Sequence, residues 1–223
     1  MSDRFAPAPR PAHRLVPSRF PPIGLFDTVA TAADLAAVME LAGWTNDRLV
    51  AERVARLPRA EWVYGRPNAS VVMAAFLHAA PGGMRFNAGA LGAWYASATL
   101  ATAAAEVAHH LRREAVARGE AETRRVFRQY VSVLEGTYLD IRGEQAAREA
   151  VYDPTDHAAG QALGEAVRAG DGAGIVYDSL RHAGGVNVVA YRPRLIGEVA
   201  QGEHFEITAR VGERLVAVRR LGG

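Results

Sequence analysis

Residues 99–134, TLATAAAEVAHHLRREAVARGEAETRRVFRQYVSVL, contain one helix pattern followed by one strand pattern. Apolar residues at helical spacing predict a helix that begins at Thr99 and ends near Arg118. After Thr123 the spacing of the apolar residues changes to two, which is typical of a strand, and the segment 126–134 is predicted to form one. The fold must therefore combine helices with a sheet.

Both patterns recur on either side of this stretch. The segment 156–169 predicts a second helix. Its core side is expected to carry Ala162, Leu163, Ala166 and Val167. The segment 70–78 is apolar throughout and fits either a buried strand or a buried helix. Further strands are predicted at 13–16, 93–96, 137–141, 175–177, 186–191, 205–209 and 215–218. These elements predict an α+β fold, a single compact domain with a mixed or antiparallel sheet and flanking helices.

Three parts of the chain are distinguished within this plan. Residues 1–12 contain three prolines among small and charged residues and are expected to be a flexible N-terminal lead-in. Residues 13–223 are expected to form the single domain, because neither a repeat nor a linker divides them. Residues 27–78 are expected to be an additional helical segment within it, with a helix over 31–43 that Thr31 would cap and another over 46–57.

The composition is that of a globular protein and excludes several kinds of chemistry. Hydrophobic residues make up 49% of the 223 residues, which is enough to build a core and excludes a disordered chain. There is no cysteine, so disulfides, thiolate metal sites and cysteine nucleophiles are excluded. All 26 basic residues are arginines, so a lysine Schiff base and a phosphate-loop lysine are excluded as well.

Charge and hydropathy predict neither a nucleic-acid partner nor a membrane. The formal net charge is only +2, and the arginines between residues 112 and 125 alternate with acidic residues instead of forming a basic patch. No run of 18 apolar residues is present, and the N-terminal residues lack the apolar region of a secretory signal. A cytoplasmic location is therefore expected.

Two further patterns predict no special site. Of the seven histidines, only His109 and His110 are close in sequence, and adjacent helix residues point about 100° apart, so no metal site is expected. The glycine-rich run 170–174 is followed by a predicted strand, whereas a dinucleotide-binding loop leads into a helix. We interpret that run as a turn.

Three polar side chains could belong to a site, and each has an ordinary alternative. Arg85 lies among glycines, where a guanidinium can approach a phosphate closely, but it could also be a surface arginine. Glu106 lies in an alanine-rich helix stretch, where its carboxylate could hold ribose hydroxyls, or it could be a surface residue that faces the two histidines. Ser179 follows a predicted strand, where active-site hydroxyls and turn serines are both found, and it lacks a nucleophile-elbow pattern.

Together these residues belong to a series of short motifs that resembles the RES domain family, which is named for an arginine, a glutamate and a serine. The motifs are GGMRFN (82–87), WYAS (94–97), TAAAEV (102–107) and GIVYDSLR (174–181). HRLVPSRF (13–20) resembles the opening segment of the family, and GG (184–185) followed by VVAYRP (188–193) resembles its last strand. The resemblance makes Arg85, Glu106 and Ser179 the three residues that give the family its name.

The resemblance implies an NAD-consuming toxin of a toxin–antitoxin pair, with a fold similar to that of ADP-ribosyltransferase toxins. Such a protein cleaves the nicotinamide–ribose bond, either by phosphorolysis to nicotinamide and ADP-ribose 1″-phosphate or by transfer of ADP-ribose to a protein. NAD is then a substrate, phosphate is a candidate co-substrate, and no cofactor is expected. The implied partner is a helix-turn-helix antitoxin that covers the active site. A non-catalytic interaction protein on the same scaffold and a homo-oligomer through residues 33–57 stay open as alternatives.

The resemblance also implies roles for individual residues. Glu106 would hold the ribose hydroxyls and face the positive charge that develops on the sugar. Arg85 would bind phosphate, and Ser179 would hydrogen-bond the substrate without acting as a nucleophile. The remaining substrate-binding residues are expected to be Arg14, as a second guanidinium, Tyr95, packed against nicotinamide or ribose, and Arg181.

Overall fold

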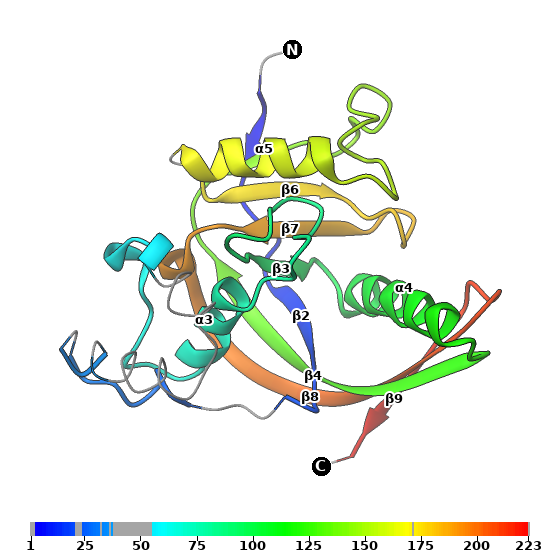
Figure 1. The fold of residues 1–223 in the computed structure, drawn as a ribbon, viewed down its shortest axis with the longest axis horizontal. Coiled ribbons are helices and arrows are strands. Elements are labelled where there is room, and N and C mark those ends of the chain that lie inside the picture. The colour runs from blue at the N-terminus through cyan, green and yellow to red at the C-terminus, as the bar shows by residue number, and fades with distance from the viewer. Residues whose placement is uncertain are drawn as a thin grey trace.

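The computed structural model describes residues 3–20, 24–31, 33–35, 37, 55–170 and 172–222 (Figure 1). Its strands are β1 (Phe5–Ala6), β2 (Ala12–Pro17), β3 (Trp94–Ser97), β4 (Glu122–Leu134), β5 (Tyr138–Asp140), β6 (Gly174–Asp178), β7 (Val186–Ala190), β8 (Ile196–Arg210) and β9 (Val216–Leu221). Within these described ranges the strands form one nine-stranded sheet in the order β1-β5-β6-β7-β3-β2-β4-β8-β9. The helices are α3 (Ala69–Leu77), α4 (Leu100–Arg118) and α5 (Ala158–Ala169), with short 3-10 helices at Arg59–Glu61 and Pro193–Leu195.

The sheet contains both kinds of strand pairing. Strands β5 and β6 pair in parallel, with Leu139 opposite Ile175. A parallel pair needs a crossover connection, and α5 lies in the connection between these two strands. The other recorded strand pairs are antiparallel. This mixed sheet with flanking helices confirms the predicted α+β fold.

Helix α4 covers the curved ribbon formed by the two longest strands, β4 and β8 (Figure 1). Its alanines let it lie close to the sheet, where Ala104 and Ala108 share a core cluster with Phe127 and other apolar side chains. The Thr99 side chain caps the helix start by accepting from the backbone N–H of the residue three positions on, at 3.1 Å. The helix and the strand predicted from residues 99–134 are both confirmed.

Helix α5 lies over the other part of the sheet, next to β6 (Figure 1). We expected Ala162 and Ala166 on its core side, but both are exposed, and that part of the prediction was wrong. The buried residues of the helix are Gly160 and Gly164. A Cβ at Gly164 would lie 1.9 Å from the carbonyl oxygen of Phe86, so glycine is what allows the helix to approach that backbone. The partly buried apolar residues beside them are Leu163 and Val167.

The N-terminal residues differ from their prediction. Part of the expected lead-in, Phe5–Ala6, forms the edge strand β1 and pairs with β5. The carbonyl of Arg4 accepts a 2.8 Å hydrogen bond from the Asp140 backbone N–H, and the two side chains form an ion pair of 3.1 Å. These contacts attach the segment to the sheet despite its prolines.

The segment between β2 and β3 is only partly described. Residues 70–78, which fitted a strand or a helix, form most of α3, and its Val72 and Phe76 are buried. Thr31 caps a helix start as expected, because its Oγ1 accepts from the Asp34 backbone N–H at 3.1 Å. Most residues of the helices expected over 31–43 and 46–57 lie outside the described residues. In the described ranges, no helix combines the length and apolar character needed to cross a bilayer.

Candidate active site

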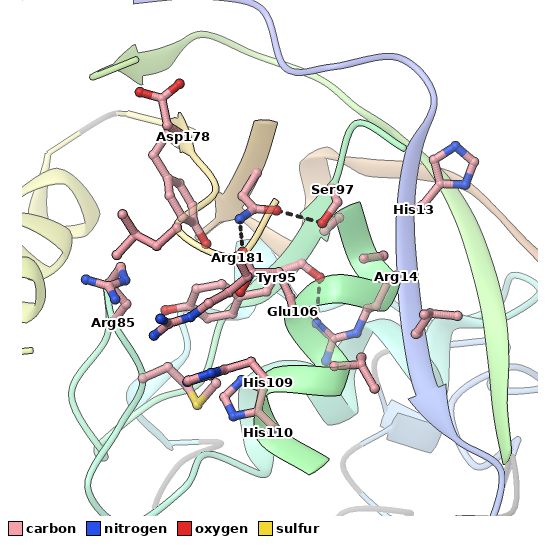
Figure 2. A pocket seen from close by; sticks show the side chains of 18 of the residues that line it. His13, Arg14, Arg85, Tyr95, Ser97, Glu106, His109, His110, Asp178 and Arg181 are labelled. Carbon is pink, nitrogen blue, oxygen red and sulfur yellow. Dashed lines mark hydrogen bonds between the residues drawn. The ribbon is translucent and has the colours of Figure 1, made fainter. Parts of the chain in front are cut away.

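A cavity of about 240 Å³ lies beside the first half of α4 (Figure 2). Its walls come from β2, β3, β6, β7 and α4, from the loops that precede β3 and follow β6, and from the segment before α5. Five of the six residues predicted to form a site line this cavity. They are Arg14, Arg85, Tyr95, Glu106 and Arg181. The fold therefore brings side chains from distant parts of the chain to one place.

Within the described residues, hydrogen bonds hold one oxygen of the Glu106 carboxylate and leave the other without a donor. Its Oε1 accepts a hydrogen bond of 2.7 Å from the Ser179 hydroxyl and another of 2.7 Å from the Asn187 side-chain amide. No described residue donates a hydrogen bond to Oε2. One oxygen thus fixes the carboxylate, and the other is left for a ligand.

Ser179 lies behind Glu106 and is buried, with 7% of its surface exposed. Its Oγ donates to the carboxylate and accepts from the backbone N–H groups of Arg181 and His182, at 3.1 and 3.0 Å. The hydroxyl is therefore fully occupied, and it does not line the cavity that contains Glu106. Its contacts are those of a group that orients the carboxylate and the following loop.

Two buried residues that the sequence reasoning did not select complete this network. The Ser97 hydroxyl donates a 2.7 Å hydrogen bond to Asn187 Oδ1, which turns the amide nitrogen of Asn187 toward Glu106 (Figure 2). Ser97 is 4% exposed and Asn187 is 2% exposed. The available signal was a lone amide in the apolar strand VNVVA, because a buried polar side chain needs partners.

Arg85 reaches the cavity from the loop that α5 packs against. Its Nη1 donates to the carbonyl oxygens of Val151 and Asp153, at 3.2 and 2.7 Å. A Cβ at Gly160 would lie 2.4 Å from the Arg85 carbonyl oxygen, so α5 supports this loop directly. One nitrogen of the guanidinium is thereby anchored, and the rest of the group is left to face the cavity (Figure 2).

The cavity is lined by an arginine and a glutamate, and a serine donates a hydrogen bond to that glutamate. These are the three residues that the sequence motifs single out. The family model described as the RES domain matches residues 53–210. The chain belongs to the RES domain family. No curated protein matches the sequence. The matched range of the RES domain includes Arg85, Glu106 and Ser179, whereas Arg14 lies before it, so the place of Arg14 in the site rests on geometry.

Arg14 extends from β2 into this RES-domain cavity. Its Nη1 donates to the Tyr95 carbonyl oxygen at 2.9 Å, and its guanidinium lies 4.8 Å from the centre of the Trp94 ring. Its Nε is buried and has no hydrogen-bond partner in the part of the chain that the structure describes. Burial lowers the pKa of Arg14 to about 10, which leaves the group charged at neutral pH.

Tyr95 presents its ring, and not a free hydroxyl, to the cavity. The hydroxyl donates to Asn87 Oδ1 at 2.7 Å and accepts from the Phe86 backbone N–H at 3.0 Å. Burial raises the pKa of Tyr95 well above its ordinary value, so the side chain is neutral. The ring is held rigidly and can pack against a planar group.

The cavity carries more positive than negative charge. Its guanidinium groups belong to Arg14, Arg85, Arg113 and Arg181, and its carboxylates belong to Glu106 and Asp178. Burial, and next the charge of Arg181, lower the pKa of the neighbouring His109 to about 4, so that imidazole is neutral at pH 7. Among the described residues no three His, Asp or Glu side chains are grouped so that they could hold a metal ion. The site is suited to an anionic ligand that also offers hydroxyls to one carboxylate.

Proposed function

We propose that this RES domain degrades NAD by cleaving the bond between nicotinamide and ribose, with inorganic phosphate as the acceptor, and that it is the toxin of a toxin–antitoxin pair. The observation that supports this most is the Glu106 carboxylate, pinned through one oxygen in a cavity with four guanidinium groups. NAD offers the complementary groups, which are phosphates and a sugar that becomes positive as the bond breaks. Membership of the RES family is consistent with an enzyme that acts on NAD.

The chemistry needs charge stabilisation and little proton transfer. When the bond between ribose C1″ and the nicotinamide nitrogen breaks, the electron pair goes to the nitrogen, and nicotinamide leaves as a neutral molecule without a general acid. The ribose becomes oxocarbenium-like. Glu106 Oε2 binds the ribose hydroxyls and stabilises this charge, and Tyr95 packs against the nicotinamide ring.

The arginines supply the phosphate contacts in this mechanism. Arg85 and Arg14 hold the incoming phosphate, one oxygen of which attacks C1″ and forms ADP-ribose 1″-phosphate. A phosphate oxygen is already negative, so no base has to remove a proton from it. Arg181 binds the phosphates of the substrate. Ser179 orients Glu106 and does not act as a nucleophile.

An enzyme that degrades a general metabolite has to be held inactive, and we propose a helix-turn-helix antitoxin as the partner that covers the cavity. Addition of the purified partner is expected to stop NAD consumption. The partner is also expected to shield the cavity from solvent, which hydrogen exchange would detect as slower exchange of the loop around Arg181. Partner binding without any change in activity would contradict this assignment.

The test of the function is product identification after incubation with NAD, with and without phosphate. We expect phosphate-dependent release of nicotinamide together with ADP-ribose 1″-phosphate, and no release by the Glu106→Gln variant. Release without phosphate and label on a protein would instead assign protein ADP-ribosylation. Free ADP-ribose would assign hydrolysis, and binding of a partner without any use of NAD would assign a non-catalytic interaction protein.

A further inference from the structure

A second and larger hollow adjoins the active-site cavity. Its volume is about 1160 Å³, against about 240 Å³ for the cavity around Glu106. Four residues line both spaces. They are His109, Asp178, Leu180 and Arg181. The two spaces therefore share a wall that contains Arg181.

The small cavity has too little volume for a whole dinucleotide. Sites that enclose drug-sized ligands usually measure roughly 300–1,000 Å³, and NAD is at the upper end of such sizes. A cavity of about 240 Å³ suits one half of the molecule, the nicotinamide with its ribose. The other half has to lie outside that cavity, and the adjoining hollow has the volume for it.

We propose that the larger hollow binds the adenosine half of NAD and that Arg181 holds the pyrophosphate between the two halves. This inference rests on the proposed function, since it assumes that the small cavity binds the nicotinamide half. It assigns a binding site for a purine nucleoside to a hollow that shares four lining residues with the cavity around Glu106.

Arg181 is placed to contact a phosphate at the junction. Its backbone N–H donates to Ser179 Oγ at 3.1 Å, which anchors the residue to the same serine that holds Glu106. Within the described residues no hydrogen bond or ion pair holds its guanidinium. A guanidinium at the shared wall that has no partner among the described residues suits the paired oxygens of a pyrophosphate.

Arg112 lines the hollow, and its guanidinium is held in a fixed plane. Its guanidinium donates to three carbonyl oxygens, those of Arg210, Arg214 and Leu215, at 3.3, 2.9 and 3.1 Å. These bonds fix the plane of the group and tie α4 to the turn between β8 and β9. Guanidinium planes stack well on aromatic rings, and adenine is such a ring.

The rest of the lining leaves room for a nucleoside. A Cβ built on Gly143, Gly184 or Gly212 would meet no atom of the described residues within 4 Å. Asp178 Oδ2 accepts a 2.7 Å hydrogen bond from the Gly143 backbone N–H, which holds this carboxylate at the shared wall. Its other oxygen is suited to the hydroxyls of the adenosine ribose.

The experiment compares NAD with nicotinamide mononucleotide, which contains the same scissile bond but no adenosine. The wild-type protein is expected to have a KM for NAD at least about tenfold lower than that for the mononucleotide. Ala146 and Ala183 are exposed and line only the larger hollow, so Ala146→Trp and Ala183→Trp fill it without entering the small cavity. Ala147→Trp is the control, since Ala147 is an exposed neighbour that lines neither space.

Both filling variants are expected to raise the KM for NAD by about tenfold or more, with no more than about a twofold change for the mononucleotide. The control should behave as wild type with both substrates. Equal use of the two substrates by the wild type, or filling variants that affect both alike or neither, would overturn the inference while the proposed function stands. If the wild type releases nicotinamide from neither compound, the proposed function has failed, and this inference fails with it.

Discussion

Asn187 donates a hydrogen bond of 2.7 Å to Glu106 and reaches the same carboxylate oxygen that accepts the Ser179 hydroxyl. Two donors on Oε1 fix the plane of the carboxylate before any substrate arrives. A carboxylate that is already oriented has little reorganisation to undergo as positive charge develops in front of it. Activity should therefore depend on Asn187 and Ser179 as well as on Glu106 itself.

The Asn187→Ala variant tests this dependence. We expect kcat for NAD to fall by about tenfold to a hundredfold, with a smaller change in KM, because Glu106 loses one of its two orienting bonds. We also expect the free energy of unfolding to fall by about 1–3 kcal/mol, since Ser97 and Glu106 both lose a buried partner. Steady-state kinetics and urea unfolding on the same preparations measure the two effects.

The Asn187→Asp variant tests whether Asn187 orients the Glu106 carboxylate or only supports the fold. It places a second carboxyl group within hydrogen-bond distance of Glu106, and like charges raise the pKa of one member of such a pair. The acid limb of the pH profile of kcat should then move to higher pH. A profile with the wild-type shape and only a lower maximum would show that Asn187 has a structural role alone.

Substitution of Glu106 separates chemistry from folding. Glu106→Gln and Glu106→Ala should each lower NAD consumption by at least about a hundredfold, because the group that stabilises the positive sugar is lost. Ser179→Ala should retain more activity than either, since Asn187 still holds the carboxylate. Nicotinamide release and thermal melts provide the comparison. A Glu106 variant within threefold of wild type and normally folded would remove this residue from the mechanism.

Local patterns were enough to predict most of the fold. Helix α4 and strand β4 follow from the change of apolar spacing near Thr123, because burial of one face requires that spacing. The buried side of α5, which approaches the backbone of Phe86, could not be predicted in the same way. Glycine is a weak helix former, so the two glycines of α5 do not indicate from the sequence that they form its buried side. Their close packing depends on where the Phe86 backbone lies in space.

The sequence predicted some residues of the site and missed others, and this difference has a physical cause. Arg85 and Glu106 belong to motifs that could be recognised from their residues, and both line the cavity. Asn187 and Ser97 were missed because their function depends on pairing across the strands β7 and β3, where the two residues lie opposite each other. Strand register is a tertiary property that residue spacing along one strand does not contain.

The contact between α5 and the loop of Arg85 gives a prediction on stability. Gly164→Ala should lower the free energy of unfolding by about 1–3 kcal/mol, because its methyl group would lie 1.9 Å from the Phe86 carbonyl oxygen and the helix would have to move. Gly170→Ala is the matched control at the end of the same helix, since its Cβ would meet its nearest atom at 3.7 Å. Urea unfolding of both variants measures the difference. Equal effects would contradict the close approach.

Arg85→Ala should weaken the use of substrate more than it weakens the fold. We expect the KM for phosphate or NAD to rise by about tenfold or more, and the free energy of unfolding to fall by about 1 kcal/mol with the loss of two carbonyl contacts. Arg66→Ala is the control, because Arg66 also donates to a carbonyl, that of Ile196 at 2.7 Å, but lies outside the cavity. A collapsed melt for Arg85→Ala alone would show that this arginine is structural.

The low pKa of His109 predicts how stability changes with pH. Burial and the positive charges of Arg181, Arg113 and Arg112 lower this pKa to about 4, from an ordinary value of 6.5, and the adjacent His110 acts in the same direction. Between these values the unfolded chain binds a proton that the folded protein does not, so stability falls as the pH decreases from about 6.5 to about 4. His109→Gln should make the curve of unfolding free energy against pH shallower in this window.

The curve of unfolding free energy against pH contains a second, more acidic region, which serves as an internal control for His109. A hydrogen bond from Arg142, first among several causes, lowers the pKa of Asp140 to about 2 from 3.8. The stability that this carboxylate contributes is present above pH 4 and is lost only as the pH falls toward 2. His109→Gln should leave that lower region unchanged. A variant curve that is parallel to wild type between pH 6.5 and 4, as measured by urea unfolding in steps of pH, would show that His109 does not contribute to the pH dependence there.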